Sequence, residues 1–439
     1  MRFVRIALFM LLATILVLSV ACGSSGSDEP VTLRLEVSLT PQELATFEPA
    51  IQALDEAHPE WVIVLETTPQ SGLVEKINTQ LAGDDLPDVV RSPGLFVQQW
   101  IRQEAFLDLS DRIEEDRLDL GDFYAGPLEQ FRWQDKLWGL PDTAAPSLVY
   151  YNKDIFDAAG LAYPTDDWTY QDMRRAALQL TLDAEGRTPA DPDFDPESIQ
   201  QWGWNAGWTN IWQRHLVQAF GGDLCVNDDC TLMTFTSPET IQAADWWFSL
   251  SAEDHATLFD PYGGSQTGVP GDPFIAGKAA MGYNGFFAVG QLNDAGGINY
   301  DVAQPFLGVD GRRSVSLSTN GYLVSARTEH PDQAWALVSA LLSPDFLAET
   351  WGQPGHSVPA RRSVADSVIN LEHPPANQQV IVAAMEYANV FKPHTASAFE
   401  AYARTSDLFA QAARGELSPQ EAMTQIEQTA NEVLSRDRE

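Results

Sequence analysis

Three tryptophans, Trp204, Trp208 and Trp212, recur at every fourth position among glycines and amides. On a helix this spacing places them on one face. Aromatic faces stack on the C–H surface of a sugar ring, while neighbouring amides hydrogen bond to hydroxyl groups. The same spacing is also typical of a buried helix face. We expect Trp204 and Trp208 to contact a small solute and Trp212 to lie in the core.

Cys225 and Cys230 are separated by Val-Asn-Asp-Asp, a sequence that favours a turn. In an oxidising compartment an even pair of cysteines predicts a disulfide, here one that closes a hairpin. The alternative is half of a zinc site. It needs two further ligands nearby, and the seven histidines are scattered without paired spacing.

The amino terminus has the pattern of an export signal. Arg2 and Arg5 precede an uncharged apolar run over 6–20, which is shorter than the roughly 20 residues of a membrane-spanning helix. Ala21 stands directly before Cys22, as in the lipobox of bacterial lipoproteins, although Ser19 occupies a position where leucine is usual. We expect a signal peptide over 1–21, an acyl chain on Cys22 and a flexible Gly/Ser-rich tether over 22–30. Ordinary secretion is the alternative.

The formal charge of −36, from 26 basic and 62 acidic side chains, argues against nucleic acid as a partner. It also makes a strongly anionic solute a poorer expectation. No metal or other cofactor is indicated. Tyr150 and Tyr151 could suggest the tyrosine pair of ferric-ion binders, but adjacent residues on a strand point to opposite faces and cannot both bind one ion.

Alternating strand and helix patterns predict an α/β fold with a mainly parallel sheet in the first part of the chain. Strands are expected at 31–38, 61–66 and 87–91, with helices at 41–58 and 73–81. Open α/β sheets bind ligands at the carboxyl ends of their strands. The loops 38–41, 70–72 and 92–94 are therefore candidate site loops, and Ser38 and Ser92 are their candidate contacts.

The middle of the chain is predicted to be largely helical, with helices near 169–180, 211–220 and 238–250. Strands return at 280–284, 301–305 and 321–325. The tail is helical over 332–342 and 378–434, with a break at 415–419.

Four segments with distinctive residues follow one another along the chain. They read Gly-Leu-Pro-Asp at 139–142, Tyr-Asn-Lys-Asp-Ile-Phe at 151–156 with Ala-Gly at 159–160, Phe-Ile-Ala-Gly-Lys-Ala-Ala-Met at 274–281 with Asn-Gly at 284–285, and Gly-His-Ser-Val-Pro-Ala-Arg-Arg at 355–362. Their order resembles that of the extracellular solute-binding proteins that include the maltose- and other carbohydrate-binding components of ABC importers.

The resemblance implies two discontinuous α/β lobes around a ligand cleft, joined by three crossings of the chain in the type II arrangement of periplasmic binding proteins. We expect crossings near 140–145, 284–287 and 319–323, where glycine or proline stands beside a short strand. The first lobe would comprise 31–141 and 285–319, and the second 142–284 and 320–439.

Polar residues beside these crossings can reach both lobes, so Asp142, Asn284 and Asn320 are candidate ligand contacts. Stabilisation of turns is the other role open to them. Phe286 or Phe287 occupies the position where the resemblance places a stacking aromatic, often tryptophan in that family. Arg361, with Arg362, could bind an anionic group or form an ion pair.

The resemblance favours a monomeric receptor, lipid-anchored outside the cytoplasmic membrane, that delivers a small solute, expected to be a carbohydrate, to an ABC permease. An exported glycoside hydrolase is the alternative from another class, and it needs two suitably spaced carboxylates beside a cleft. A ligand sensor, or a receptor for a polyamine or a glycerol phosphodiester, also fits the sequence.

Overall fold

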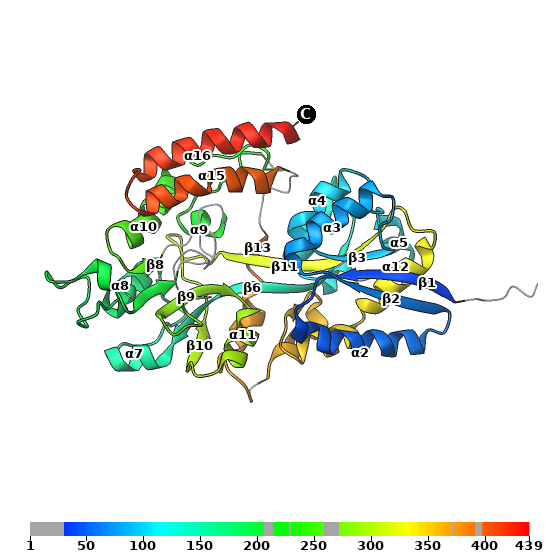
Figure 1. Ribbon diagram of the computed structural model, residues 1–439, viewed down its shortest axis with the longest axis horizontal. Helices are drawn as coiled ribbons and strands as arrows, with labels where there is room; N and C mark the ends of the chain where they lie inside the picture. The colour runs from blue at the N-terminus through cyan, green and yellow to red at the C-terminus, as the bar shows by residue number, and fades with distance from the viewer. Residues whose placement is uncertain are drawn as a thin grey trace, which may run out of the picture.

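The computed structural model describes residues 30–205, 214–227, 230–258, 272–370, 372–390 and 397–438, and these form two lobes (Figure 1). The first lobe begins with strands β1, β2 and β3, and β1 pairs in parallel with both neighbours. Its early elements are β1 (Val31–Val37), α2 (Pro41–Ala57), β2 (Trp61–Thr67), α3 (Gln70–Ala82), β3 (Val89–Pro93), α4 (Gly94–Ile101), α5 (Ser110–Glu115), α6 (Ala125–Gln130), and the short hairpin of β4 (Arg132–Trp133) and β5 (Lys136–Leu137).

Helix α2 begins where its sequence predicts. Thr40 and Glu43 form a capping box, in which the Thr40 hydroxyl accepts from the Glu43 backbone and the Glu43 carboxylate accepts from the Thr40 backbone. Pro41 occupies the first helical position, where its missing N–H is not needed. The carboxyl end of β1 is therefore followed by a helix with a well-defined start.

Two long strands, β6 (Leu140–Asn152) and β11 (Val315–Val324), run from one lobe into the other (Figure 1). The last residues of β11 pair with β3, and its middle pairs with the first half of β6. The second half of β6 pairs with β9 (Ala279–Gly285) and β10 (Tyr300–Ala303). These strands make the sheet continuous across both lobes.

In the second lobe, β7 (Trp202–Asn205) pairs in parallel with β9 on one side and with β8 (Thr257–Leu258) on the other. Tyr170, Trp204, Trp246, Phe306 and Met423 are among the residues that fill its core. Its helices are α7 (Lys153–Ala159), α8 (Tyr170–Leu180), α9 (Arg214–Ala219), α10 (Pro238–Ala252), α15 (Ala398–Ala413) and α16 (Pro419–Leu434).

Later segments complete the first lobe. Helix α12 (Pro331–Leu341) packs against β1 and β11, and its Trp335 shares a core with Leu33 and Leu35 of β1. The same core includes Trp351 in a π-helix, Ala348–Gly352, after α13 (Pro344–Leu347). A third cluster of buried residues joins the lobes and includes Tyr150, Phe286 and Leu317. The elements of this region are α11 (Ala288–Ala295), β12 (Val358–Pro359), α14 (Gln379–Ala384) and β13 (Ala388–Val390).

The expected α/β fold with two discontinuous lobes is confirmed, but the chain divides differently from the expected boundaries. Strands β9 and β10 lie on either side of 284–287 in sequence, and both pair with the second half of β6, so the chain does not change lobes there. Ala360 belongs to the core of the first lobe and Ala401 to that of the second, which places a crossing between them.

The short 3-10 helices are Leu120–Asp122, Pro196–Ser198, Arg362–Val368 and Ser435–Asp437. Within the described ranges no helix combines the length and apolar character needed to span a membrane. The signal, Cys22 and most of the tether expected over 1–30 lie outside those ranges.

Candidate functional site

Parallel pairing brings the carboxyl ends of β1, β2 and β3 to one edge of the first lobe, where α2, α3 and α4 begin (Figure 1). Ser38 lies at this edge and is partly exposed. Ser92 is fully buried, and its hydroxyl donates to the Pro93 carbonyl at 3.1 Å. Of the two loop serines proposed from the sequence, only Ser38 presents any surface to solvent.

A buried ion pair joins β3 to the first residues of β6. The Arg91 Nε of β3 donates to the Asp142 carboxylate at 2.6 Å, and both side chains are almost fully buried. Arg91 also donates to the Thr143 hydroxyl at 3.1 Å and stacks on Trp351, with its guanidinium carbon 4.2 Å from the ring centroid. Burial lowers the pKa of Arg91, but the charge of Asp142, its hydrogen bond and the charges of other nearby groups together outweigh burial, so the pKa is raised. The Asp142 carboxylate is fully buried and accepts from Arg91, and its contact with a ligand stays a prediction.

Arg361 also has structural partners. Its Nε donates to Asp122 at 2.7 Å, one of its terminal nitrogens donates to the Leu342 carbonyl at 2.9 Å, and its guanidinium lies over the Phe123 ring. The sequence left two roles open for Arg361, anion binding and an ion pair, and the structure shows the ion pair.

Asn320 is half-buried on β11, opposite Thr143 of β6 and Pro93 of β3, where the crossing strands meet the edge of the first lobe.

A polar cluster lies at the other end of the crossing, beside β9. The Asp272 carboxylate accepts from the side-chain amides of Asn205 at 2.9 Å and Asn284 at 3.1 Å. It also accepts from the backbone N–H of Phe274 at 2.7 Å and of Ile275 at 3.3 Å. Burial raises the pKa of Asp272, although these hydrogen bonds lower it in part.

These three polar residues line a small cavity of about 10 Å³, room for about one water molecule, together with Tyr150, Phe274 and Leu292, among others. Asn284 was proposed from the sequence, whereas Asn205 and Asp272 were not. Asn205 and Asp272 are 67 positions apart, and only the fold brings the Asn205 amide to the Asp272 carboxylate that also accepts from Asn284.

The adjacent phenylalanines differ in environment. Phe286 is 1 % exposed and belongs to the cluster that joins the lobes. Phe287 is partly exposed, and its ring lies against Gly285, where a β-carbon would be 2.3 Å from a ring carbon. Of the two candidates for stacking, Phe287 is the one that is partly accessible.

The helix expected at Trp204 is wrong. It lies on β7 rather than on a helix, is 2 % exposed, and packs against Phe306 in the core of the second lobe. Gly203 beside it approaches α8 so closely that a β-carbon would be 2.0 Å from the Ala177 carbonyl oxygen. Trp208 and Trp212 lie outside the described residues.

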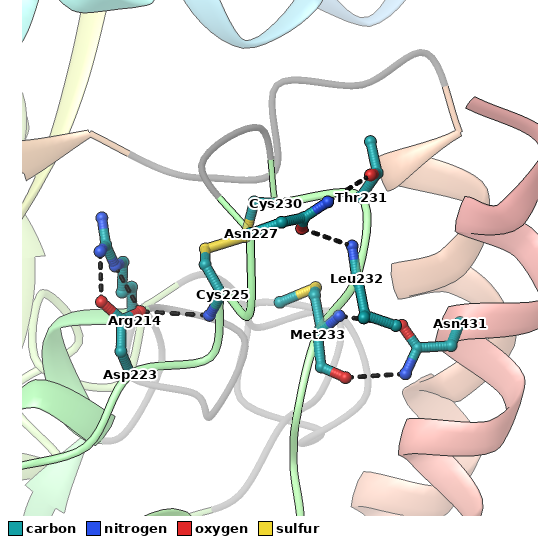
Figure 2. The surroundings of a disulfide bond; sticks show 9 residues. All are labelled: Arg214, Asp223, Cys225, Asn227, Cys230, Thr231, Leu232, Met233 and Asn431. Carbon is teal, nitrogen blue, oxygen red and sulfur yellow. Dashed lines mark hydrogen bonds and ion pairs between the residues drawn. A yellow bond between two sulfur atoms is a disulfide. The ribbon is translucent and has the colours of Figure 1, made fainter. Parts of the chain in front are cut away.

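Figure 2 shows how the hairpin of the second lobe is held. Cys225 and Cys230 are joined by a disulfide, and Asp223 links Cys225 to Arg214 at the start of α9. Asn431 of α16 accepts from the Met233 backbone N–H at 2.9 Å and donates to its carbonyl at 2.7 Å. The described part of the chain contains no group of three His, Cys, Asp or Glu side chains arranged to bind a metal.

Comparisons with known sequences identify relatives over much of this chain. The sequence profile of the family described as bacterial extracellular solute-binding protein matches residues 39–346. A protein from Brucella abortus described as a binding protein is 23% identical over 308 residues, which are 69% of this chain and 70% of that protein. The multiple sugar-binding protein of Streptococcus mutans is 24% identical over 246 residues, which are 55% of this chain and 53% of that protein.

Solved structures share the fold. An ABC substrate-binding protein of Listeria monocytogenes, in complex with cycloalternan, has a TM-score of 0.78 and 21% sequence identity, covering 93% of this chain and 100% of that one. The sugar-binding protein MalE of Xanthomonas citri has a TM-score of 0.76 and 17% identity, covering 93% of this chain and 98% of that one. At these identities the likeness establishes the arrangement of two α/β lobes.

Proposed function

This chain belongs to the bacterial extracellular solute-binding proteins, and we propose that it is the receptor of an ABC importer for a carbohydrate. Members of the family act outside the cytoplasm and deliver solutes to membrane permeases. The neighbour in complex with cycloalternan, and the relative described as a multiple sugar-binding protein, support carbohydrate as the class of solute.

The observation that carries the proposal is the polar cluster beside β9, next to the half-buried Phe287. Its amides, Asn205 and Asn284, and its carboxylate, Asp272, are groups of the kind that hydrogen bond to sugar hydroxyls. The half-buried Phe287 follows Asn284 by three positions and supplies an aromatic face for a sugar ring. Ligand between the lobes would favour the closed over the open form, with β6 and β11 as two of the hinge segments.

We also propose that binding involves no chemical step. A glycoside hydrolase needs one carboxyl group as an acid and a second as a base or nucleophile beside the scissile bond. The Asp142 carboxylate is fully buried and held by Arg91. The Asp272 carboxylate accepts four hydrogen bonds from the protein. These two side chains are therefore suited to organising structure and positioning a ligand.

A screen of solutes tests this function. The exported protein, which is rich in tryptophan, is titrated by fluorescence with mono- and oligosaccharides, amino acids, polyamines and glycerol phosphodiesters. We expect saturable changes with a carbohydrate and with no other class. Saturation by a different class, with no response to any sugar at millimolar concentration, would overturn the assignment.

A further inference from the structure

His356 lies on the segment that connects the core of the first lobe to the crossing strands. Its backbone N–H donates at 3.0 Å to the carbonyl of Trp351, which belongs to that core. The hydroxyl of the next residue, Ser357, donates to the Ala144 carbonyl of β6 at 3.2 Å. Strand β12 follows directly and pairs with β6. The backbone of His356 is therefore held beside a strand that runs between the lobes.

Elements of both lobes meet near this histidine. The Gln42 side chain, at the start of α2, donates to the Asp294 carboxylate of α11 at 3.5 Å, across 252 positions of sequence. Helix α2 begins at the carboxyl end of β1, and α11 follows Phe287 directly. The charges of Glu43 and Asp294 both act on the His356 imidazole, so the ring lies close to both helices.

Nε2 of His356 is a buried polar atom without a hydrogen-bond partner among the described residues. Leaving such an atom unpaired is unfavourable, so its presence in a native protein requires an explanation. Burial lowers the pKa of His356 more than the charges of Glu43 and Asp294 raise it, and the imidazole is neutral at pH 7. A neutral imidazole has one nitrogen that donates and one that accepts, as a hydroxyl group requires.

His215 differs from His356 in position. Its nitrogens also have no partner in the described part of the chain, but its ring is 2 % exposed and stacks on Tyr283 within the second lobe. The His356 side chain is partly exposed and lies where α2 and α11 meet. Of these two histidines, only His356 is placed where a solute between the lobes can reach it.

We propose that His356 is a specificity-determining residue of the receptor, and that its Nε2 hydrogen bonds to a hydroxyl group of the bound carbohydrate. This inference rests on the proposed function and adds one polar contact to it. Opening of the lobes separates α2 from α11 and gives a solute access to the ring. On closure, a sugar that lacks this hydroxyl leaves Nε2 unpaired and is therefore rejected.

Calorimetric titration with deoxy sugars tests the contact. Glucose, galactose, mannose and their disaccharides are the probes, and the one that binds most tightly is compared with its monodeoxy analogues. In the wild type, we expect one analogue to bind at least tenfold more weakly than the parent sugar. In His356→Leu, which removes both ring nitrogens, this analogue and the parent should differ by less than about threefold. Losses at the other hydroxyls should be the same in both proteins.

Further measurements separate this contact from an effect on folding. His356→Gln retains a polar group and should restore part of the discrimination, and His373→Leu, at an exposed position, should leave every affinity unchanged. The nitrogen NMR resonances of the wild-type imidazole, assigned by comparison with His356→Gln, should shift on saturation with the parent sugar and less with the deoxy analogue.

Two results would count against the proposal in different ways. Identical losses across the analogues in the wild type and in His356→Leu, with no shift of the imidazole resonances, would overturn the contact and leave the receptor function intact. Saturation by another solute class, with no binding of any sugar probe, would overturn the proposed function and this contact together.

Discussion

Phe286 and Phe287 are neighbours in the chain, but they face different surroundings. The ring of Phe286 is enclosed in the cluster that joins the lobes, and the ring of Phe287 is partly exposed over Gly285. The sequence could not choose between them, because both are phenylalanines at the end of a strand. The difference in burial assigns a packing role to Phe286 and leaves Phe287 as the candidate for binding.

This difference predicts opposite effects of two alanine substitutions. Phe287→Ala should weaken sugar binding at least tenfold and change the melting temperature little, because a partly exposed stacking face is lost. Phe286→Ala should cost about 3–5 kcal/mol of stability through loss of buried volume. Calorimetric titration and thermal unfolding measure both. Unchanged affinity in Phe287→Ala would remove that side chain from the site.

His215 predicts a pH dependence of stability. Its ring is 2 % exposed and stacks on Tyr283, and among the described residues neither nitrogen has a hydrogen-bond partner. Burial lowers its pKa to about 3. The unfolded state binds the proton more readily, so His215 destabilises the fold as the pH falls below its unfolded pKa of about 6.5.

At pH 4.5 this single group should cost about 2–3 kcal/mol relative to pH 7, by linkage. Denaturant unfolding of the wild type and of His215→Phe at both pH values isolates the effect, because other titrating groups are common to the two proteins. The gap in stability between the two proteins should shift in favour of the variant at the lower pH. A gap that does not depend on pH would contradict a neutral buried imidazole.

At the residue scale, the sequence located polar side chains near the crossings but not their partners. Asp142 and Arg91 are 51 positions apart, and their ion pair exists only once β3, β11 and β6 are adjacent. Asp272 was not singled out for a similar reason. Its partners are the amides of Asn205, 67 positions earlier, and Asn284, 12 positions later, and these contacts form only in the folded chain. Composition and spacing carry no signal for such pairs.

Helix α16 is held to the hairpin of the second lobe by one carboxylate. Glu427 accepts from the backbone N–H of Phe235 at 2.7 Å and of Thr236 at 3.0 Å, and from the hydroxyls of Thr234 and Thr236. Together with Asn431, it fixes the segment that follows the Cys225–Cys230 disulfide (Figure 2). The carboxyl-terminal helix is thereby tied to a loop about 190 residues earlier.

Glu427→Ala should destabilise the protein by about 2–3 kcal/mol, because two backbone N–H groups lose a charged acceptor. Glu432→Ala, on the exposed side of the same helix, is the matched control and should change stability by less than about 0.5 kcal/mol. Equilibrium unfolding in urea measures the difference. Similar values for the two variants would show that the contacts of Glu427 contribute little.

At the element scale, local patterns identified β1, β2 and α2 because alternation and capping residues are local signals. They were misleading at Trp204, whose helical spacing with two later tryptophans masks a strand. That strand is set by pairing with β8 and β9 and by the close approach of Gly203 to α8. Strand β6 contains Pro141 and Pro146, which weaken a strand signal, and it is also stabilised by distant partners.

For the whole molecule, the family resemblance predicted two lobes, and the sequence placed the crossings less well. Short strands beside glycine or proline occur at many positions, so the end of β9 at Asn284–Gly285 could not be distinguished from a true crossing. Core packing makes the distinction, because it assigns Trp335 to the first lobe and Val302 to the cluster beside β6.

Anchoring of the whole molecule is tested at Cys22. If this residue is acylated, Cys22→Ser should move the exported protein from the membrane fraction to the soluble fraction, because the acyl chains supply the membrane affinity. Mass spectrometry of the amino-terminal peptide provides an independent readout. Recovery of the wild type in the soluble fraction with an unmodified cysteine would favour ordinary secretion.

The central claim is that this chain binds a carbohydrate without altering it. Isothermal titration calorimetry of the exported protein with a neutral oligosaccharide selected by the solute screen, followed by chromatography of the recovered sugar, tests it most directly. We expect saturable binding of one sugar per chain and complete recovery of the intact sugar. Absence of binding by every sugar, or recovery of cleaved products, would contradict it.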